Sequence, residues 1–585
     1  RKLMNSLDTL SGLKRRFNCA KPDSRMIQRN VIIVTLVVAA VAGQNLLQNP
    51  DFESLSNWDC FSHHCELTSD KHSGQHAIKS SGRNQTIMGP SQWVTLKKNT
   101  RYEAVAFIKL LQNAHGKLFA SVKLTVEYDF VDGSKNYVPI AEQPTVWKGS
   151  WIELSGDIFT PDKAIKTSRI YAEGLDPGID FLMDSASLTE IPENTNWKSE
   201  SDKVINHQRK QTMHLRISAD ANIDPSQVQI EVVQMKHAFP FGTAVAATEL
   251  LTGDTRYRDF IYKHFNWAVL ENALKWQQME PTRHHINYDK PLQAIHELKA
   301  HGLKVRAHCV VWSVDHTIPH WLQQMTGDAL KQAVTERING VVPKVKGLVE
   351  GWDVNNENLH GWFFQQHTGD FDYILDIYRQ VHLADNTIPL FANDYDVVTS
   401  GKKTVAYRDH VLKIKNANVG LGGIGVQGHF SRGSCPDPTL IKRRLDKLSE
   451  AGLPIFVTEM DIILPDENHR ADCYEKAMRA FFGHPNVQGI LIWGFWSNRH
   501  WRGTDASLVT GDEFRINAAG QRYLHLIEQE WHTSTKRNLT QGGSFDVHGF
   551  KGDYHVKVTY HGRVLKNQNV TLGESPQTVN LHVTA

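Results

Sequence analysis

Two glutamates occur in separate apolar runs in the second half of the chain. Glu357 ends "LVEGWDVNNE", and Glu459 lies within "PIFVTEMDI". Cleavage of a glycosidic bond needs two carboxyl groups, because one protonates the leaving oxygen while the other, ionised, attacks the anomeric carbon or activates water. One glutamate at a strand end is ordinary, whereas two at the same rim of a barrel would suit this chemistry.

Polar residues near both glutamates fit the same chemistry. Asn356 precedes Glu357 and could hold the 2-hydroxyl of the reacting sugar, a contact that strengthens in the transition state. Asp461 and His429 could form a hydrogen-bonded chain with Glu459 that keeps this carboxylate ionised and oriented. The alternative for His429 is a hydrogen-bonded core histidine, and we favour the chain.

Eight apolar runs with helical segments between them must position these residues. The alternation predicts an α/β protein, a (β/α)₈ barrel over 236–533, whose chemistry lies at the carboxyl ends of the strands. The alternative is an open doubly wound sheet, but no glycine-rich phosphate fingerprint follows the first run. The runs are 240–246, 265–272, 303–312, 348–357, 389–395, 422–430, 454–462 and 487–496.

The segments on either side of the barrel have strand patterns. Residues 44–191 alternate between apolar and polar positions and carry turn residues at short intervals, which predicts a β-sandwich. Residues 192–235 read as a polar linker followed by lead-in strands. Residues 534–585 predict a small C-terminal all-β domain.

Residues 1–43 are expected to be an upstream segment followed by a signal peptide. Residues 26–43 combine a positive start at Arg29, an apolar core and a small-residue cleavage pattern ending in Ala40 and Ala42. A membrane anchor is the alternative, but the run is too short to cross a bilayer. The sequence therefore predicts a secreted, extracellular protein, and sequons at Asn84, Asn538 and Asn569 agree with that.

The remaining composition narrows the partners and the redox chemistry. A formal net charge of +2 without long runs of one sign indicates neither nucleic acid nor a membrane surface as a partner. In a secreted chain we expect a local disulfide between Cys60 and Cys65. Cys435 and Cys473 are candidates for a second disulfide, which would leave Cys309 as a buried thiol.

Several motifs in register carry a resemblance to a known family. "WDVNNE", "VTEMDI", "RAHCVVW", "GVQGH" and "WGFWSNRHW" resemble blocks of glycoside hydrolase family 10, whose members are mainly endo-β-1,4-xylanases. The resemblance covers nearly the whole predicted barrel. It implies that Glu357 is the acid/base and Glu459 the nucleophile of a double displacement that retains anomeric configuration, with no cofactor for catalysis.

The resemblance also implies a set of substrate-binding residues. The residues implied to surround the reacting sugar are Asn356, Gln427, His429, His308 and Lys275. Those implied to hold hydroxyls of the next sugar outward are Glu271 and Asn272. The indoles implied to form the aromatic walls are Trp312, Trp493 and Trp501.

Some positions depart from the family pattern. Asn355 replaces the usual apolar residue before the acid/base asparagine, Ser313 and Asp315 stand in a variant of W-H-S-Q, and Trp496 adds an indole. These changes leave both carboxylates in place but put the choice between xylan and β-1,4-glucan in doubt.

The two ends of the N-terminal module resemble carbohydrate-binding modules of the family 4, 9 and 22 type. That resemblance implies a structural calcium at Glu53 and Asp184, with ordinary ion-pair or capping roles as the alternative. Candidate sugar platforms are Trp58, Trp93, Tyr102, Trp147 and Trp151, about half of which we expect in the core.

Together these features predict a secreted retaining endo-β-1,4-xylanase that acts on plant cell-wall polysaccharide. The first alternative is an endo-β-1,4-glucanase or an enzyme with both activities. The second is a catalytically silent carbohydrate-binding protein, which could lose either glutamate without harm, whereas this chain has both.

Overall fold

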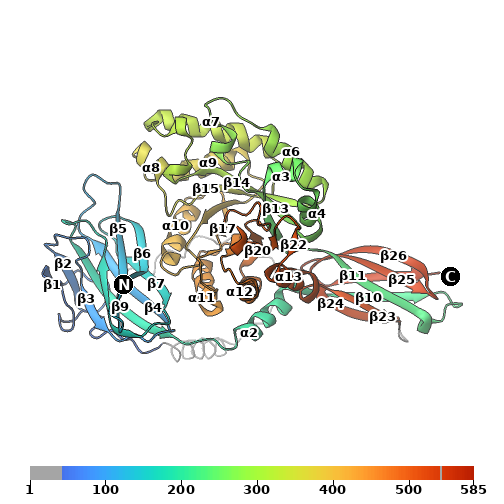
Figure 1. Ribbon diagram of the computed structural model, residues 1–585, viewed down its shortest axis with the longest axis horizontal. Helices are drawn as coiled ribbons and strands as arrows, with labels where there is room; N and C mark the ends of the chain where they lie inside the picture. Colours follow the sequence, from blue (N-terminus) through green and yellow to red (C-terminus); the bar gives the residue numbers. More distant parts are fainter. Residues whose placement is uncertain (1–42, 540–542, 585) are drawn as a thin grey trace, which may run out of the picture. The chain divides into compact units, whose positions relative to one another are not determined.

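The computed structural model describes residues 43–539 and 543–584 (Figure 1). The predicted signal segment, 26–43, lies outside the described residues except for Gly43. Residues Asn45–Ala585 form one compact unit. In the described part of the chain, no helix is both long enough and apolar enough to cross a bilayer.

The N-terminal module is a sandwich of two antiparallel sheets, as predicted. Strand β4 shows the reason, because its residues alternate strictly between partly buried and buried, so one face meets the core. One sheet has the order β1 (His64–Thr68), β2 (Ala77–Ser81), β9 (Phe181–Ile191), β4 (Arg101–Leu110), β7 (Ile152–Phe159). The other has the order β3 (Ser91–Val94), β8 (Ile165–Glu173), β5 (Ala120–Phe130), β6 (Lys135–Val146).

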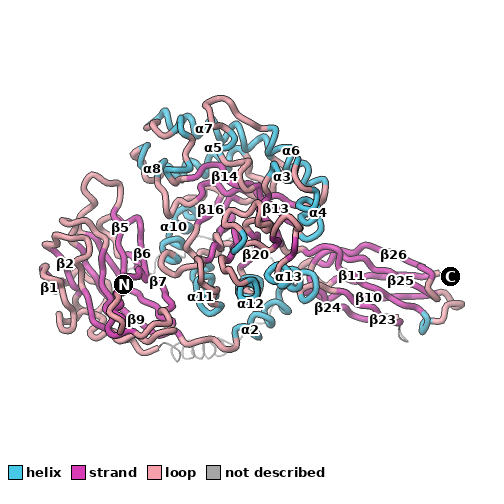
Figure 2. Tube along the Cα trace, viewed as in Figure 1, coloured by secondary structure: helices cyan, strands magenta, loops and turns pink. Residues whose placement is uncertain are grey.

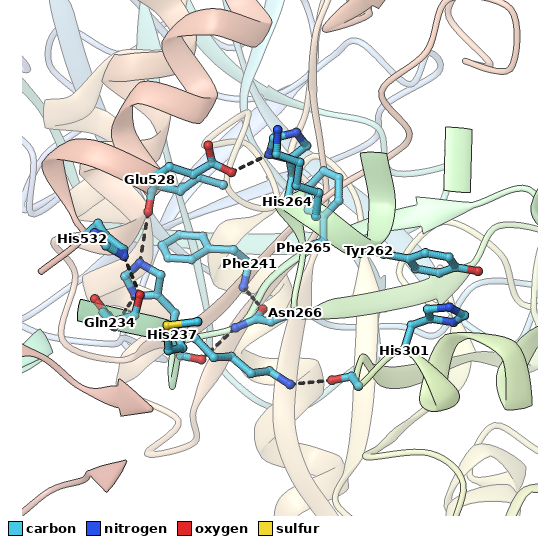
Figure 3. Close-up of a pocket in the computed structure, with 15 residues that line it drawn as sticks. Gln234, His237, Phe241, Tyr262, His264, Phe265, Asn266, His301, Glu528 and His532 are labelled. Atoms are coloured by element: carbon cyan, nitrogen blue, oxygen red, sulfur yellow. Dashed lines mark hydrogen bonds and ion pairs between the residues drawn. The ribbon is translucent and has the colours of Figure 1, made fainter. Parts of the chain in front are cut away.

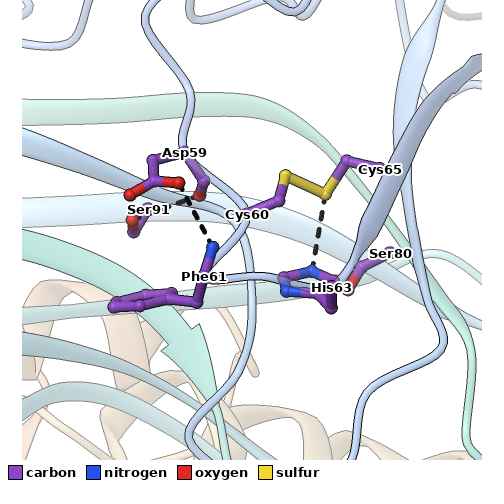
Figure 4. The surroundings of a disulfide bond; sticks show 7 residues. All are labelled: Asp59, Cys60, Phe61, His63, Cys65, Ser80 and Ser91. Atoms are coloured by element: carbon purple, nitrogen blue, oxygen red, sulfur yellow. Dashed lines mark hydrogen bonds between the residues drawn. A yellow bond between two sulfur atoms is a disulfide. The ribbon is translucent and has the colours of Figure 1, made fainter.

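The expected disulfide and the candidate second one are both present. Cys60 and Cys65 are joined just before and within β1, and the His63 ring lies 3.4 Å from the Cys65 sulfur (Figure 4). Cys435 is joined to Cys473, and Cys309 is a buried free thiol.

A second sandwich is assembled from two distant segments of the chain. The predicted linker forms α2 (Trp197–Val204) and a π turn (Ile205–Arg209), and the lead-in strands then pair with the C-terminal strands rather than leading straight into the barrel. Pairing removes the exposed edges that two isolated strands would present. The sheets are β24 (Ser544–Phe550), β10 (Lys210–Ala219), β27 (Gln577–Val583), and β23 (Ser534–Asn538), β11 (Val228–His237), β25 (Gly552–Tyr560), β26 (Arg563–Leu572).

The region between the two sandwiches along the chain is a closed barrel of eight parallel strands, which confirms the predicted fold. Figure 2 shows its strands with helices around them. All eight predicted runs contain a strand, and pairing of β17 with β19 closes the ring. The strands are β12 (Phe241–Val245), β13 (Trp267–Leu270), β14 (Lys304–Trp312), β15 (Trp352–Asn356), β16 (Leu390–Asp394), β17 (Leu421–Val426), β19 (Ile455–Ile462) and β20 (Val487–Ile492). A two-residue strand, β18 (His429–Phe430), extends the edge of β19.

The helices between the strands begin and end at local signals in the sequence. In α11, for example, Asp437 caps the backbone N–H of Leu440 and Pro438 occupies the first turn, while Ile441, Leu445 and Leu448 share the buried face. The barrel helices are α3 (Ala247–Thr252), α4 (Thr255–His264), α5 (Trp276–Met279), α6 (Asp289–Ala300), α7 (Gly327–Val345), α8 (Phe363–Thr368), α9 (Tyr373–Ala384), α10 (Thr404–Asn416), α11 (Pro438–Ser449), α12 (Glu467–Phe482) and α13 (Ala518–His525).

A histidine-rich pocket of about 430 Å³ lies where β11 continues toward β12 (Figure 3). Two of its histidines have hydrogen-bond partners in the protein. His237 Nε2 lies 3.1 Å from the carbonyl oxygen of Ile527, and His532 Nε2 lies 2.7 Å from that of Gln234. Burial lowers the pKa of His237 to about 4. These contacts join the start of the barrel to the turn after α13, so the histidines have a structural role.

Candidate active site

The carboxyl ends of the barrel strands bring the predicted site residues together. Glu357 follows the last residue of β15, and Glu459 lies within β19. Glu357 has a φ of 56°, a left-handed conformation that is uncommon for a residue with a side chain. Its backbone N–H donates to the carbonyl of Asn393 at 2.8 Å, so the neighbouring strand holds this conformation.

Two side-chain donors hold the carboxyl group of Glu357. Trp312 Nε1 donates to Oε2 at 2.8 Å, and Gln427 Nε2 donates to Oε1 at 3.1 Å. Desolvation by the surrounding protein, aided by the negative charge of Asp394, nevertheless raises the pKa of Glu357 to about 7. Glu357 can therefore carry a proton near neutral pH, as a general acid requires.

Glu459 has the opposite electrostatic environment. Burial favours its protonated form, but the hydrogen bond from His429 and the nearby charges of His308 and Lys275 outweigh burial and lower its pKa. His429 Nε2 lies 3.2 Å from Oε2, and Asn393 Nδ2 donates to Oε1 at 2.8 Å. Glu459 is thus the ionised member of the pair.

The structure places Asp461 behind His429, in the order that the sequence suggested. His429 Nδ1 lies 3.0 Å from Asp461 Oδ2. Burial would lower the pKa of His429, but Asp461 and Glu459 raise it to about 9. Asp461 also accepts hydrogen bonds from Trp501 Nε1 at 2.8 Å and Arg502 Nη1 at 3.0 Å, so the carboxylate is fixed from three sides.

Asn393 is a site residue that the sequence analysis did not assign. Its Nδ2 donates to Asn356 Oδ1 at 2.9 Å as well as to Glu459, while Thr458 Oγ1 donates to its Oδ1 at 2.6 Å. Asn393 therefore connects β15, which ends just before Glu357, with β19, which contains Glu459. Its place near the end of the run "PLFANDY" was the available signal.

Asn356 presents a free donor in the site. Its side chain is buried, and within the described residues its Nδ2 has no hydrogen-bond partner. A buried donor without a partner is costly, so a ligand oxygen would relieve it. The predicted contact with a sugar hydroxyl is consistent with this arrangement.

The predicted sugar-binding residues that follow β13 or lie on β14 are in the same region. Lys275 Nζ donates to Asn272 Oδ1 at 3.0 Å and lies 4.7 Å from the ring of Trp312. Buried His308 is oriented by Asp353, whose Oδ2 lies 3.0 Å from His308 Nδ1.

Glu271 immediately follows β13 and precedes Asn272 in the chain. Burial raises the pKa of Glu271, and the charge of Lys275 opposes that rise. The negative charge of Glu459 adds to the rise, so Glu271 lies in the electrostatic surroundings of the carboxylate pair.

The predicted aromatic walls differ in exposure. Trp493 is buried, with its ring 5.3 Å from that of His308, whereas Trp501 is 54% exposed and lies 4.9 Å from the ring of His429. Trp501 has the open face that stacking on a sugar needs. Trp496 is buried and donates to the carbonyl of Gly511 at 2.9 Å, so it belongs to the packing of the loop after β20.

Two departures from the family pattern compensate each other. Buried Ser313 donates its hydroxyl to Asn355 Oδ1 at 2.6 Å, and Asn358 Nδ2 lies 3.3 Å from the same hydroxyl. The polar residue at 355 is therefore paired through its oxygen with the polar residue at 313 behind the catalytic strand. Asp315 begins a short 3₁₀ turn, Asp315–Thr317, outside this pair.

The carboxylates predicted to bind calcium hold one loop of the N-terminal module. Asp184 accepts backbone N–H groups of His72 at 2.7 Å and Ser73 at 2.9 Å, and Glu53 accepts that of Gln75 at 2.5 Å. The His76 ring adds a contact to the second Glu53 oxygen. N–H donors already occupy both carboxylates, an arrangement that does not favour a cation, and calcium binding stays a prediction.

Comparisons with known proteins place the chain in a family. The profile of glycosyl hydrolase family 10 matches residues 231–522, and that of a carbohydrate binding domain matches residues 44–178. Endo-1,4-beta-xylanase 3 of Arabidopsis thaliana is 30% identical over 525 residues, which cover 88% of this chain and 67% of that protein. The chain belongs to glycosyl hydrolase family 10 and carries an N-terminal carbohydrate-binding domain.

The other similar proteins include one that is not named as a xylanase. The anti-sigma-I factor RsgI6 of Acetivibrio thermocellus is 36% identical over 406 residues, which cover 69% of this chain and 52% of that protein. The solved xylanase TsXylA of Thermoanaerobacterium saccharolyticum aligns with 48% of this chain and 94% of its own at 28% identity, with a TM-score of 0.45. The chain spans about half the length of the first curated relatives it matches.

Proposed function

We propose that this protein is a retaining endo-β-1,4-xylanase. The observation that carries the proposal is that two carboxyl groups at the carboxyl ends of the barrel strands have opposite surroundings, which raise the pKa of Glu357 to about 7 and lower that of Glu459. Asn393 contacts Glu459 and Asn356. Gln427 in turn contacts Asn356 and Glu357, so both carboxylates belong to one hydrogen-bonded site. The names of the xylanase relatives support xylan as the substrate.

In this proposal each carboxylate has one task in each step. Protonated Glu357 gives its proton to the leaving glycosidic oxygen while Glu459 attacks the anomeric carbon, which forms a glycosyl ester and releases one part of the chain. The ester removes the negative charge of Glu459, a charge that helps to raise the pKa of Glu357. Glu357, now ionised more readily, takes a proton from the water that hydrolyses the ester.

Reducing-sugar release by the purified protein on xylan and on carboxymethyl-cellulose, beside Glu459→Ala, tests the proposal. We expect release from xylan that the substitution abolishes. Release mainly from the cellulose substrate, lost in the variant, would favour the endo-β-1,4-glucanase alternative. A folded protein that binds polysaccharide but releases nothing would be the catalytically silent alternative, and the name of the anti-sigma relative makes this outcome worth testing.

The N-terminal module offers a face suited to a polysaccharide chain. Four residues stand directly opposite one another across β3, β8, β5 and β6, so they share one face of the sheet. They are Trp93, Arg169, Glu127 and Tyr137. Trp93 is 55% and Tyr137 53% exposed, and the guanidinium of Arg169, paired with Glu127, lies 5.0 Å from the Trp93 ring.

We infer that this face binds the polysaccharide, because exposed rings can stack on sugars while the charged pair bonds hydroxyls. Among the other candidate platforms, Trp58 and Tyr102 are buried in the module's core. Trp93→Ala should weaken retention of the protein on insoluble xylan about tenfold, since stacking is worth ~1–2 kcal/mol. Phe159→Ala, an exposed aromatic on the other sheet, is the control, and equal retention of both variants would contradict the assignment.

We also propose that the protein is secreted into an extracellular environment. The signal-like segment, the two disulfides and exposed asparagines in the three sequons support this. Expression in a eukaryotic host should yield protein in the medium whose mass falls on treatment with peptide N-glycosidase. Retention inside the cells without glycans would contradict the proposal.

A further inference from the structure

A second pocket lies next to the residues predicted to bind the sugar beyond the reacting one. Its volume is about 240 Å³. It is lined by the turn and helix α3 after β12, by the segment from the turn after β13 to the start of α6, and by Arg499 from the loop after β20. Asn272 is common to both regions, because it lines this pocket and accepts the hydrogen bond from Lys275. A group attached to a bound polysaccharide could therefore reach the pocket.

The pocket contains an arginine held by a buried carboxylate. Glu249 is 5% exposed; its Oε1 accepts the backbone N–H of Asp254 at 2.6 Å, and its Oε2 accepts Nε of Arg499 at 2.6 Å. The Arg499 side chain is 52% exposed, and its Nη1 donates to the carbonyl of Asn498 at 3.2 Å. Among the described residues its Nη2 has no protein partner. The inner edge of the guanidinium is thus fixed while part of its outer edge is free.

The charge of the pocket favours an anion with hydroxyl groups. Arg499 and exposed Lys290 contribute two positive charges against the single negative charge of Glu249. Exposed amides of Asn272 and Asn287 and the hydroxyl of Thr248 supply neutral hydrogen-bonding groups. A guanidinium binds a carboxylate through two parallel N–H bonds, which ammonium groups and amides do not reproduce.

We propose that this pocket binds a uronic acid branch of the xylan chain, with Arg499 receiving the branch carboxylate and Glu249 positioning Arg499. The inference rests on the proposed xylanase activity and names the class of xylan that the enzyme prefers. An unbranched chain leaves the pocket without its ligand, so the branch adds binding energy that a linear substrate cannot supply.

The test compares kcat/KM on a uronic-acid-substituted xylan with kcat/KM on linear xylo-oligosaccharides, in the wild type and in Arg499→Gln. The ratio of kcat/KM on the branched substrate to kcat/KM on the linear one should fall about tenfold in Arg499→Gln, because this variant loses the charge-assisted hydrogen bonds to the branch carboxylate. Arg499→Lys keeps the charge but not the two-pronged geometry and should give an intermediate ratio. Arg515→Gln is the matched control, since Arg515 is also an exposed arginine paired with a glutamate.

The outcomes separate this inference from the function beneath it. A wild type that hydrolyses linear xylan, with the same ratio in all variants, would overturn the branch pocket alone. A wild type without activity on linear xylan would overturn the proposed function and this inference with it. If Arg499→Gln does not fold, Arg499→Lys decides, and a ratio equal to that of the wild type would overturn the inference.

Discussion

At the scale of single residues, the site depends on different surroundings for two identical side chains. Glu357 accepts hydrogen bonds from neutral donors, an indole and an amide, and lies near the negative charge of Asp394. Glu459 instead faces His429, whose own pKa is raised to about 9. Environment, not residue type, thus decides which glutamate keeps a proton.

The pH dependence of activity should follow from these states. Above pH 7 Glu357 loses the proton that the first step needs, so kcat/KM should fall with a midpoint near its pKa of about 7. Glu357→Gln cannot ionise and should lose this alkaline limb while slowing hydrolysis of unactivated substrates by 100-fold or more. The check is a pH–rate profile of both proteins, and an unchanged alkaline limb in Glu357→Gln would contradict the assignment.

His429 should control the acidic limb of the same profile. His429→Asn removes a positive hydrogen-bond donor that lowers the pKa of Glu459, so this pKa should rise. The acidic limb should then move to higher pH, and kcat should fall about tenfold or more. A purely structural role would lower activity at every pH alike, and that result would exclude the positioning role.

At the scale of elements, the barrel could be predicted and the second sandwich could not. Each barrel strand is a local apolar run, and the chain crosses from one to the next in order, so periodicity alone located all eight. In contrast, β10 pairs with β24 and β27, more than 300 residues further along, and no local pattern encodes such a partner.

Prediction of the site has the same limit, because local motifs do not encode contacts between residues that are distant in the sequence. The carboxylates were predicted because their motifs are local. The bridging role of Asn393 depends on contacts with Asn356 and Glu459 from two other strands.

The pair formed by Ser313 and Asn355 can be tested through stability. Ser313→Ala leaves the buried oxygen of Asn355 without its donor and should lower the free energy of unfolding by ~1–3 kcal/mol. The double variant with Asn355→Val removes both polar groups and should recover most of that loss. Denaturant unfolding of both variants is the measurement, and additive losses in the double variant would contradict the pairing.

At the scale of the whole molecule, two disulfides enclose loops of very different length. Cys435–Cys473 spans 38 residues of the barrel region, whereas Cys60–Cys65 spans 5 in the N-terminal module. A crosslink stabilises mainly by restricting the unfolded chain, and a longer loop restricts it more. The two crosslinks also act on different hydrophobic cores, so their effects should be separable.

Replacing both Cys435 and Cys473 by serine should destabilise the barrel by ~2–4 kcal/mol. The measurement is the denaturant midpoint for loss of activity, which reports on the barrel rather than on the sandwiches. The control is the double serine variant at Cys60 and Cys65, which should leave that midpoint unchanged. Equal shifts in the two variants would contradict the separation of the cores.

The most direct test of the central claim is to trap the intermediate of the double displacement. A 2-fluoro xylobioside with a good leaving group should form a stable ester that mass spectrometry of the digested protein locates on Glu459. The account predicts one label per chain on the peptide that contains "VTEMDI", with none in Glu459→Ala. A label on another residue, or hydrolysis of xylan with inversion and no label, would contradict it.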